Sequence, residues 1–353
     1  MIHNGNIVMS QSMTKELGVL VVDDQVELAG HCPKRFASKF ISEDYPWVPS
    51  TNMVDGLYAE TKLLGSAARG AAVHSLKPLK NGDQPVRQGR IDVQMHRMDG
   101  FMRAHGVRFD QNNTQVRLLA KYAPKIWLTG EMDIFPTQVN SINSIVDLKT
   151  TKDIFNDFFS IAEEYVHFSG NACWGSYDQI FKNQPLFYHF LARNFYDTDI
   201  DLLKRFNPSS SEKYDYLFSM GEDYSDVDFW FFVAGIGKPD YDDQLAKFEY
   251  PWSDHRSVLL HSLVENSIER IQEGMSTDFA AKPSPYVCRD CALKDVCDSF
   301  MPIDSAMETY HFYCDDDDND FSFDIKANSP TKAYKNAYEA YGPQVDDMFY
   351  KKI

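Results

Sequence analysis

Three consecutive runs in the middle of the chain are rich in β-branched and aromatic residues, and they constrain the fold more than any other feature. Such runs, separated by short polar segments, predict successive β-strands joined by tight connections. The three runs are TQVRLLAKYA (114–123), KIWLTGEMDIF (125–135) and NSIVDLKTT (143–151), with PTQVNSIN (136–143) as a hairpin-like connection.

The last of these runs carries an acid and a lysine two positions apart, Asp147 and Lys149. Because side chains alternate along a strand, both project from one face while Val146 and Leu148 project from the other. One face of this strand is therefore apolar and the other carries charged groups. Taken alone, this spacing also suits an ordinary surface ion pair.

A second acid, Asp133, lies at the end of the preceding strand in GEMD. Antiparallel pairing through the connection brings its carboxylate beside that of Asp147. Two adjacent carboxylates repel each other unless a cation lies between them, and Mg²⁺ or Mn²⁺ prefers oxygen ligands. Lys149 then stands at the edge of the metal, where it can stabilise developing charge or help to orient an attacking water.

The rest of the chain predicts an α/β protein with a mixed central sheet flanked by helices. We expect an N-terminal helical region, a strand-rich centre, a helix-rich middle and a cysteine-bearing C-terminal section. The expected helices are 26–40, 55–76, 152–165, 184–196 and 253–275, the last capped by Ser253 or Asp254, and the expected later strands are 214–220, 226–236 and 245–252.

Composition and charge limit the classes of function. The 353 residues are 43% hydrophobic, enough for a sizeable core, and no apolar run approaches the ~20 residues of a membrane helix. We expect a cytoplasmic protein that does not contact membranes. A net charge of −17 opposes nonspecific attraction to DNA, but the acidic run at 314–324 concentrates part of it near the C-terminus, and screening lets a distant basic groove act independently.

Two weaker fragments flank the acid and lysine positions. A GxxxH pattern ends at His74 on an expected helix, and Gln184 and Tyr188 form a QxxxY pattern on another. Residues four apart share one face of a helix. Neither fragment is specific by itself.

The order His74, Asp133, Asp147-x-Lys149, Gln184-xxx-Tyr188 resembles the PD-(D/E)XK nuclease superfamily, in particular its RecB-like exonuclease branch. The resemblance implies a restriction-endonuclease-like core. It also implies that His74, Asp133 and Asp147, with the main-chain carbonyl of Leu148, hold the metal. Lys149 becomes the catalytic lysine, and Gln184 and Tyr188 steady the site or the DNA backbone. Glu131 is an alternate ligand ranked below Asp133, because strand alternation puts it on the same face.

Three cysteines lie close together in C-x2-C-x5-C spacing, Cys288, Cys291 and Cys297. They look like three ligands that need a fourth, and thiolates suit zinc as well as an iron–sulfur cluster. The chain is similar here to AddB-type nuclease domains and CRISPR-associated adaptation nucleases, which carry one early and three late cysteines around a 4Fe-4S cluster. That likeness makes Cys32 the fourth ligand and favours iron–sulfur, so that the cluster joins the N- and C-terminal regions. If the site holds zinc, His31 is an alternative to Cys32 as the fourth ligand. The spacing of Cys173 and Cys314 gives neither of them a partner in such a site.

The expected organisation is an N-terminal extension (1–25), a RecB-like nuclease domain (26–300, with cluster-forming ends 26–40 and 286–300) and an acidic C-terminal tail (301–353). The expected function is a metal-dependent DNA exonuclease that acts at ends or on single strands in recombination, repair or processing. It has no ATP motor motif, so a helicase, recombination or CRISPR-adaptation protein is an expected partner. Two alternatives stay open: a catalytically silent DNA-binding or assembly partner on the same scaffold, and a zinc-stapled structural protein.

Overall fold

A computed structural model of the protein describes most of the chain. The described residues are 2–3, 6–22, 25–42, 44–46, 51–65, 84–151, 175–206, 208–237, 245–282, 288, 291–293, 296–297, 299, 308–313, 322–327, 333, 336–337, 340 and 349–352.

The three central runs form β5 (Thr114–Ala123), β6 (Ile126–Val139) and β7 (Ile142–Thr151). β5 and β7 both pair antiparallel with β6. The hairpin between β6 and β7 turns at Asn140 and Ser141, which have φ values of 52° and 70°. Positive φ at both central residues matches the right-handed twist of the strands. The predicted strands and their hairpin are confirmed.

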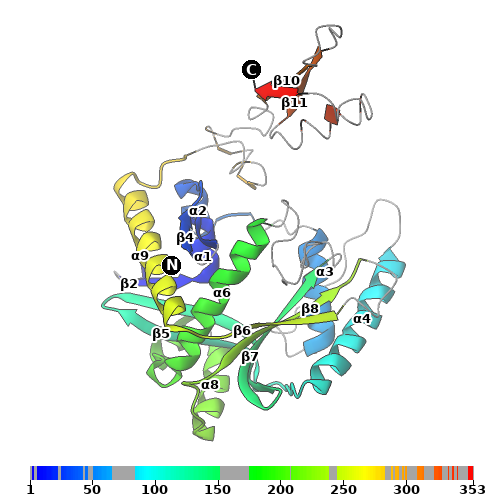
Figure 1. Ribbon diagram of the computed structural model, residues 1–353. Coiled ribbons are helices and arrows are strands. Elements are labelled where there is room, and N and C mark those ends of the chain that lie inside the picture. The colour runs from blue at the N-terminus through cyan, green and yellow to red at the C-terminus, as the bar shows by residue number, and fades with distance from the viewer. Residues whose placement is uncertain are drawn as a thin grey trace.

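Further strands extend these three into a seven-stranded mixed sheet (Figure 1). β8 (Asp228–Gly235) runs parallel to β7, and β9 (Leu245–Tyr250) runs antiparallel to β8. At the other side, β1 (Ile2–His3) pairs with β2 (Asn6–Ser10), and β2 runs parallel to β6. Residues 1–25, expected to form an extension, thus contribute strands to the central sheet.

The two faces of the sheet are covered by different helices, which explains the near-continuous apolar sequence of β8. Phe229, Phe231 and Val233 belong to a core with α6 (Gly175–Arg193) and α9 (Asp254–Ser276). Their neighbours along the strand, Trp230, Phe232 and Ala234, belong to a second core with α3 (Thr51–Leu64) and α4 (Gln84–Ala104). A strand buried on both faces needs apolar residues at every position. The predicted α/β architecture with flanking helices is confirmed.

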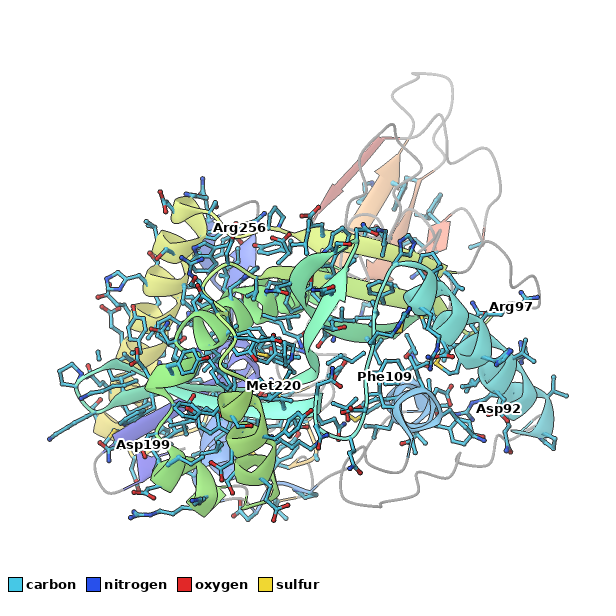
Figure 2. All side chains as sticks on the ribbon, turned by 90° about the horizontal axis from the view of Figure 1, so that it is seen from below. Asp92, Arg97, Phe109, Asp199, Met220 and Arg256 are labelled. Atoms are coloured by element: carbon cyan, nitrogen blue, oxygen red, sulfur yellow. The ribbon has the colours of Figure 1, made fainter. Side chains whose placement is uncertain are left out.

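Figures 1 and 2 show this arrangement from two directions. In Figure 1, α3 and α4 lie side by side at the opposite end of the molecule from α9. Figure 2 shows Asp92 and Arg97 on α4 at one side and Arg256 of α9 at the other. The remaining helices are α1 (Gln11–Glu16), α2 (Pro33–Phe40), η1 (Phe195–Asp197), α7 (Ile200–Phe206) and α8 (Pro208–Met220). Within the described residues, no helix has the length and apolar character needed to cross a membrane.

Two predictions of secondary structure are wrong. Residues 214–220, expected as a strand, belong to α8, where Ser211, Tyr214 and Leu217 are buried at a spacing of three while the residues between them are partly or fully exposed. That spacing places the buried side chains on one helical face and outweighs the strand preference of aromatic residues.

The N-terminal region is not wholly helical either, and the expected helix 26–40 is shorter than predicted. β3 (Val19–Val22) and β4 (Gln25–Leu28) form an antiparallel pair, and α2 begins only at Pro33. Proline suits the first position of a helix, because it lacks the amide hydrogen that would have no partner there. Val19 and Val21 are buried, so burial of this short pair decides its structure.

The expected helix 253–275 is confirmed as α9, and the amide of Arg256 donates to the side chain of its N-cap, Ser253. Residues 184–193 of the expected helix 184–196 form the second half of α6, which ends at Arg193, and the 3-10 helix η1 follows at Phe195. The expected helix 152–165 lies outside the described residues, as does the end of the expected helix 55–76.

The C-terminal region contains a small sheet in place of a simple tail. β10 (Glu308–Tyr313) pairs antiparallel with both β11 (Ser322–Ala327) and β12 (Phe349–Lys352). Phe312 and Phe323 stack at 5.3 Å between ring centroids, and Phe312 is fully buried. Alternation of apolar and polar residues in these strands gives one face that can pack.

Candidate functional site

The two acids predicted as metal ligands face each other across β6 and β7. The ladder places Ile134 opposite Val146, so Asp133 and Asp147 come next in register and share one face of the sheet. The amide of Leu148 donates to Asp133 Oδ2 at 2.7 Å. Only 1% of Asp147 is exposed. The antiparallel hairpin therefore holds two carboxyl groups together in a buried place, as the sequence predicted.

Lys149 lies beside this acid pair. Its ammonium group forms an ion pair with Asp147 Oδ2, and it lies 5.6 Å from the centroid of the Phe231 ring on β8. About a fifth of the Lys149 side chain, 19%, stays exposed. The lysine thus connects a buried acid to the outside of the site.

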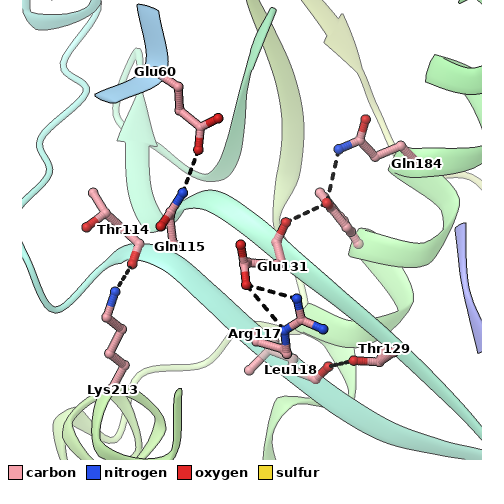
Figure 3. Close-up of polar contacts among 10 residues, drawn as sticks. Glu60, Thr114, Gln115, Arg117, Leu118, Thr129, Glu131, Gln184 and Lys213 are labelled. Carbon is pink, nitrogen blue, oxygen red and sulfur yellow. Dashed lines mark hydrogen bonds and ion pairs between the residues drawn. The ribbon is translucent and has the colours of Figure 1, made fainter. Parts of the chain in front are cut away.

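A chain of hydrogen bonds from α6 holds Asp147 from the other side. Gln184 Nε2 donates to Asp147 Oδ1 at 2.5 Å and lies 3.0 Å from the Tyr188 hydroxyl. The Tyr188 hydroxyl donates to the main-chain carbonyl of Glu131 at 2.5 Å. Figure 3 shows the path from Gln184 to the backbone of β6. The helical spacing of four puts both side chains over the sheet, so the structure brings the QxxxY pair to the acid site.

Close packing allows Tyr188 to reach β6. A Cβ atom at Gly130 would lie 2.6 Å from Tyr188 Cε1, so only glycine leaves room for the ring. The Tyr188 hydroxyl then lies beside the carbonyl of the next residue, Glu131.

Glu131, the alternate ligand, makes a different contact. Its carboxylate pairs with Arg117 Nη2 at 3.0 Å across the β5–β6 ladder (Figure 3). Both side chains are partly exposed. The contact occupies one oxygen of the Glu131 carboxylate, which fits its lower rank beside Asp133.

Burial and mutual repulsion perturb the acids. Burial raises the pKa of Asp133 well above its ordinary value, and the carboxylates of Asp147 and Glu60 raise it further, whereas Lys149 opposes the shift. Burial likewise raises the pKa of Tyr188, with Asp147 and Asp133 adding to the effect. Negative charge thus gathers here beyond what the nearby lysine neutralises, and a divalent cation would relieve this repulsion.

Glu60 is a site residue that sequence reasoning missed. It lies on α3, and its Oε1 accepts a hydrogen bond from Gln115 Nε2 at 2.5 Å (Figure 3). Gln115 is buried and has a φ of 49°, which is unusual for a residue other than glycine in a strand. The sequence around Glu60 reads as an ordinary amphipathic helix, so it offered no signal for this contact.

His74 lies outside the described residues, so its predicted place as a metal ligand stays a prediction. Among the described residues, no three His, Cys, Asp or Glu side chains stand in an arrangement that could hold a metal ion. Asp133 and Asp147 thus supply two carboxylates of a candidate metal site, and the ligand set is not complete without a further group. The main-chain carbonyl of Leu148 also stays a prediction.

The early and late cysteine segments approach each other. Cys32 is the buried N-cap residue of α2, and Cys288 is also buried. Among the described residues, neither of them forms a disulfide, and the same holds for Cys291 and Cys297. The Tyr45 hydroxyl, just beyond α2, accepts a hydrogen bond from the amide of Ala292 at 2.7 Å. Cys291 also interacts with the Tyr45 hydroxyl and helps to raise its pKa, with burial as the largest cause. Two segments far apart in sequence are therefore neighbours. No three of these four described cysteines stand in an arrangement that could hold a metal ion, so a cluster between the segments stays a prediction.

Comparison with known proteins gives a likeness of fold. No protein-family model and no curated protein matches the chain. A crystal structure of a provisionally assigned exonuclease from Eubacterium rectale superposes with a TM-score of 0.50 at 15% identity, covering 84% of this chain and 92% of that chain. The crystal structure of SSO0001 reaches a TM-score of 0.33 at 9% identity, covering 85% and 90%, which is too low to support an argument.

Proposed function

We propose that this protein is a divalent-metal-dependent nuclease of the PD-(D/E)XK type that hydrolyses phosphodiester bonds at DNA ends or on single strands. The observation that carries this proposal is the pairing of Asp133 with Asp147 on adjacent strands, with Lys149 joined to Asp147. The fold shared with the Eubacterium rectale protein, itself provisionally an exonuclease, supports the same reading.

The donor set of the site fits a hard divalent cation. Asp133 and Asp147 offer carboxylate oxygens, and repulsion between them raises the pKa of Asp133, which a bound cation would reverse. With His74 as the expected further ligand, Mg²⁺ or Mn²⁺ would supply positive charge at the scissile phosphate. In the absence of a cation, the ion pair with Lys149 partly neutralises Asp147.

Lys149 supplies a positively charged side chain that can act on the substrate. Its ammonium group stabilises the negative charge that grows on the phosphate oxygens as water attacks phosphorus and the bond to the leaving oxygen breaks. Release from Asp147 makes the ammonium available for this role, and the partial exposure of the Lys149 side chain lets it face the substrate.

Gln184 and Tyr188 act as positioning residues. Gln184 fixes one oxygen of Asp147, while Tyr188 ties Gln184 to the backbone of β6. Because the chain of bonds ends on a main-chain carbonyl, the Asp147 carboxylate is held by the sheet itself. A fixed carboxylate costs no reorganisation when the substrate arrives.

We also propose that Cys32, Cys288, Cys291 and Cys297 hold a 4Fe-4S cluster, with zinc as the alternative occupant. The contact between Tyr45 and the Ala292 amide supports a meeting of the two segments. Four thiolates suit either occupant. The cluster has a structural role, because it would join regions that are 256 positions apart.

The test of the nuclease proposal is cleavage of end-labelled single-stranded and duplex DNA by purified protein with Mn²⁺. We expect Lys149→Met to lower the rate by roughly 10²- to 10³-fold, the usual effect of removing one charge-stabilising group. Lys121→Met, which removes an exposed strand lysine on β5, is the matched control and should cleave normally. Equal activity of wild type and Lys149→Met would identify a contaminating nuclease and overturn the proposal, and so would lack of activity in the wild type.

A further inference from the structure

A cavity of about 560 Å³ adjoins the candidate site on the side of Lys149 and Gln184. Its walls come from α3, α4 and the ends of β7 and β8. Pockets that hold a single small molecule measure about 300 to 1,000 Å³. The cavity therefore has room for one nucleotide-sized ligand next to the acids.

Much of the cavity wall is apolar. Its apolar side chains include Leu63, Met95, Met98, Leu148, Phe232 and Ile236. They belong to or pack against the core under α3 and α4. A wall of aliphatic, thioether and aromatic groups suits the flat face of a base and a deoxyribose, which bury apolar surface without needing a fixed hydrogen-bond pattern.

Cationic side chains from two different elements line the cavity. Lys149 on β7 is joined to Asp147 of the acid pair. Arg90 lies on α4, where its Nη1 donates to the carbonyl of Gly237 at 2.9 Å. In the β7–β8 ladder Lys149 lies opposite Val233, and Gly237 lies four residues further along the chain, beyond the end of β8. The two cations are thus held by separate parts of the cavity wall.

Arg90 differs from the other arginine of the cavity. Arg87 forms an ion pair with Asp55, so its charge is already matched. No described carboxylate forms an ion pair with Arg90, whose Nη1 donates to an uncharged main-chain carbonyl. A guanidinium group whose charge is not matched by a described carboxylate suits the oxygens of a phosphate.

We propose that this cavity receives the terminal nucleotide of a DNA strand. The scissile phosphodiester lies at Lys149, the base and sugar lie on the apolar wall, and a terminal phosphate binds Arg90. This inference rests on the proposed function and names the subsite that selects strand ends. Glu60 also lines the cavity and repels phosphate. A volume of about 560 Å³ has room for one nucleotide, so the end of a strand fits it better than a continuous strand.

The test is binding of thymidine 3′,5′-bisphosphate to the full chain by calorimetry in EDTA, where no cleavage occurs. Binding of thymidine and binding of inorganic phosphate are measured separately for comparison. We expect the bisphosphate to bind more tightly than either, because the apolar wall and Arg90 both contribute. Arg90→Gln should weaken its binding by about tenfold, the usual scale of a charged hydrogen bond. Leu63→Trp, which fills the cavity, should weaken it by at least as much.

Arg103→Gln is the matched control, because Arg103 lies on the same helix, pairs with Asp99 and does not line the cavity. It should bind like the wild type. Melting curves check the fold of each variant, and Leu63→Phe replaces Leu63→Trp should the latter unfold. Absence of binding to the wild type, equal affinity for phosphate and bisphosphate, or equal affinity of Arg90→Gln and Arg103→Gln would each overturn the inference.

Calorimetry without metal separates this inference from the nuclease proposal. Protein that cleaves DNA but does not bind the bisphosphate rejects the subsite alone. Protein that binds the bisphosphate through Arg90 but does not cleave DNA rejects the nuclease proposal alone. Comparison of 5′- and 3′-monophosphates then tells which strand end the cavity accepts.

Discussion

At the scale of single residues, the site combines groups whose interactions conflict unless a cation is present. Asp133 and Asp147 repel each other, and Glu60 adds a third carboxylate whose charge raises the pKa of Asp133. Lys149 and Gln184 compensate for part of this by contacting Asp147. The grouped carboxylates therefore lower the free energy of unfolding of the metal-free protein. Their roles can be tested by unfolding measurements as well as by activity.

Asp133→Asn should stabilise the metal-free protein at alkaline pH. Burial and neighbouring carboxylates raise the folded-state pKa of Asp133 above its unfolded value, so the native state binds the proton more tightly. Its contribution to stability therefore falls as pH rises from the unfolded pKa through the raised one. Asparagine keeps an acceptor for the Leu148 amide and loses this penalty. Urea unfolding in EDTA should show the variant more stable at pH 8, with the difference closing near pH 4.

The effect of metal has the opposite sign. Mg²⁺ at 100 times its dissociation constant should stabilise the wild type by about 2.7 kcal/mol, because it binds only the folded state. Asp133→Asn should lose most of this gain, while Asp215→Asn, at an exposed position on α8, should behave like the wild type. A variant that is less stable than the wild type at pH 8 in EDTA would contradict the assigned electrostatics.

Gln184→Leu should lower both stability and activity. It leaves the buried oxygen of Asp147 and the Tyr188 hydroxyl without their amide partner. We expect a loss of about 1 to 3 kcal/mol in the free energy of unfolding, the cost of an unsatisfied buried group. Gln88→Leu on the exposed side of α4 should change stability by less than about 0.5 kcal/mol. Urea titration measures both, and equal losses would remove the positioning role.

At the scale of elements, the contact between α6 and β6 sets the geometry of the site. Gly130 lets the Tyr188 ring approach the strand, and the Tyr188 hydroxyl then reaches the carbonyl of Glu131. The same helix is fixed to β9 through His189, whose Nε2 lies 2.8 Å from the Tyr250 carbonyl oxygen. Two contacts on one helix therefore determine where Gln184 stands over the acids.

Gly130→Ala should separate α6 from β6. The added methyl group would meet the Tyr188 ring, and overpacking of this kind costs about 1 to 3 kcal/mol. Gly89→Ala is an informative control, because nothing lies within 4 Å of a Cβ at that position in α4. It should stabilise the protein by about 0.5 to 1 kcal/mol through helix propensity. Thermal or urea unfolding distinguishes the two, and stabilisation by both would refute the packing argument.

His189 should make the protein sensitive to acid. Burial lowers the pKa of His189 from 6.5 to about 4, so the unfolded chain binds a proton more readily than the native state between these values. Its contribution is present above pH 6.5 and is lost as pH falls toward 4, by about 3 kcal/mol. His189→Gln should show a shallower loss of stability between pH 7 and pH 4.5. The same change at His255, at the exposed start of α9, should leave the slope unaltered.

At the scale of the whole molecule, the chain brings its beginning and its end regions together. β2 joins the central sheet beside β6, and the segment around Cys291 approaches α2 through Tyr45. Closing a loop of 256 residues costs roughly 5 kcal/mol of chain entropy. Packing of β2 and β3 offsets part of that cost, and the proposed cluster would offset more.

Metal analysis tests the cluster. Protein purified without oxygen should contain iron and sulfide and absorb visible light, while Cys291→Ser should lose both and melt at a lower temperature. Cys173→Ser, at a cysteine with no partner by spacing, should keep them. Stoichiometric zinc in colourless protein would select the alternative occupant, and wild type with neither metal would reject the four-cysteine centre.

The sequence predicted the strongly periodic parts of the fold and the core of the site. β5, β6, β7, β8, β9 and α9 follow from local pattern, because burial on one or both faces leaves a clear spacing of apolar residues. Asp133, Asp147, Lys149, Gln184 and Tyr188 were found from motif order, and the structure brings them together. The prediction failed at α8, where aromatic residues suggested a strand although helical packing placed Tyr214 and Leu217 inward.

The sequence by itself determined the hairpin of β6 and β7 and the charged groups that it carries, because alternation along these strands fixes both the apolar face and the position of each acid. Only the tertiary structure decided that Glu60 approaches Asp133 and that a cavity opens between Lys149 and Arg90. These depend on where α3 and α4 pack on the sheet. Packing between distant segments is governed by the shape of whole surfaces, which no short run of residues encodes.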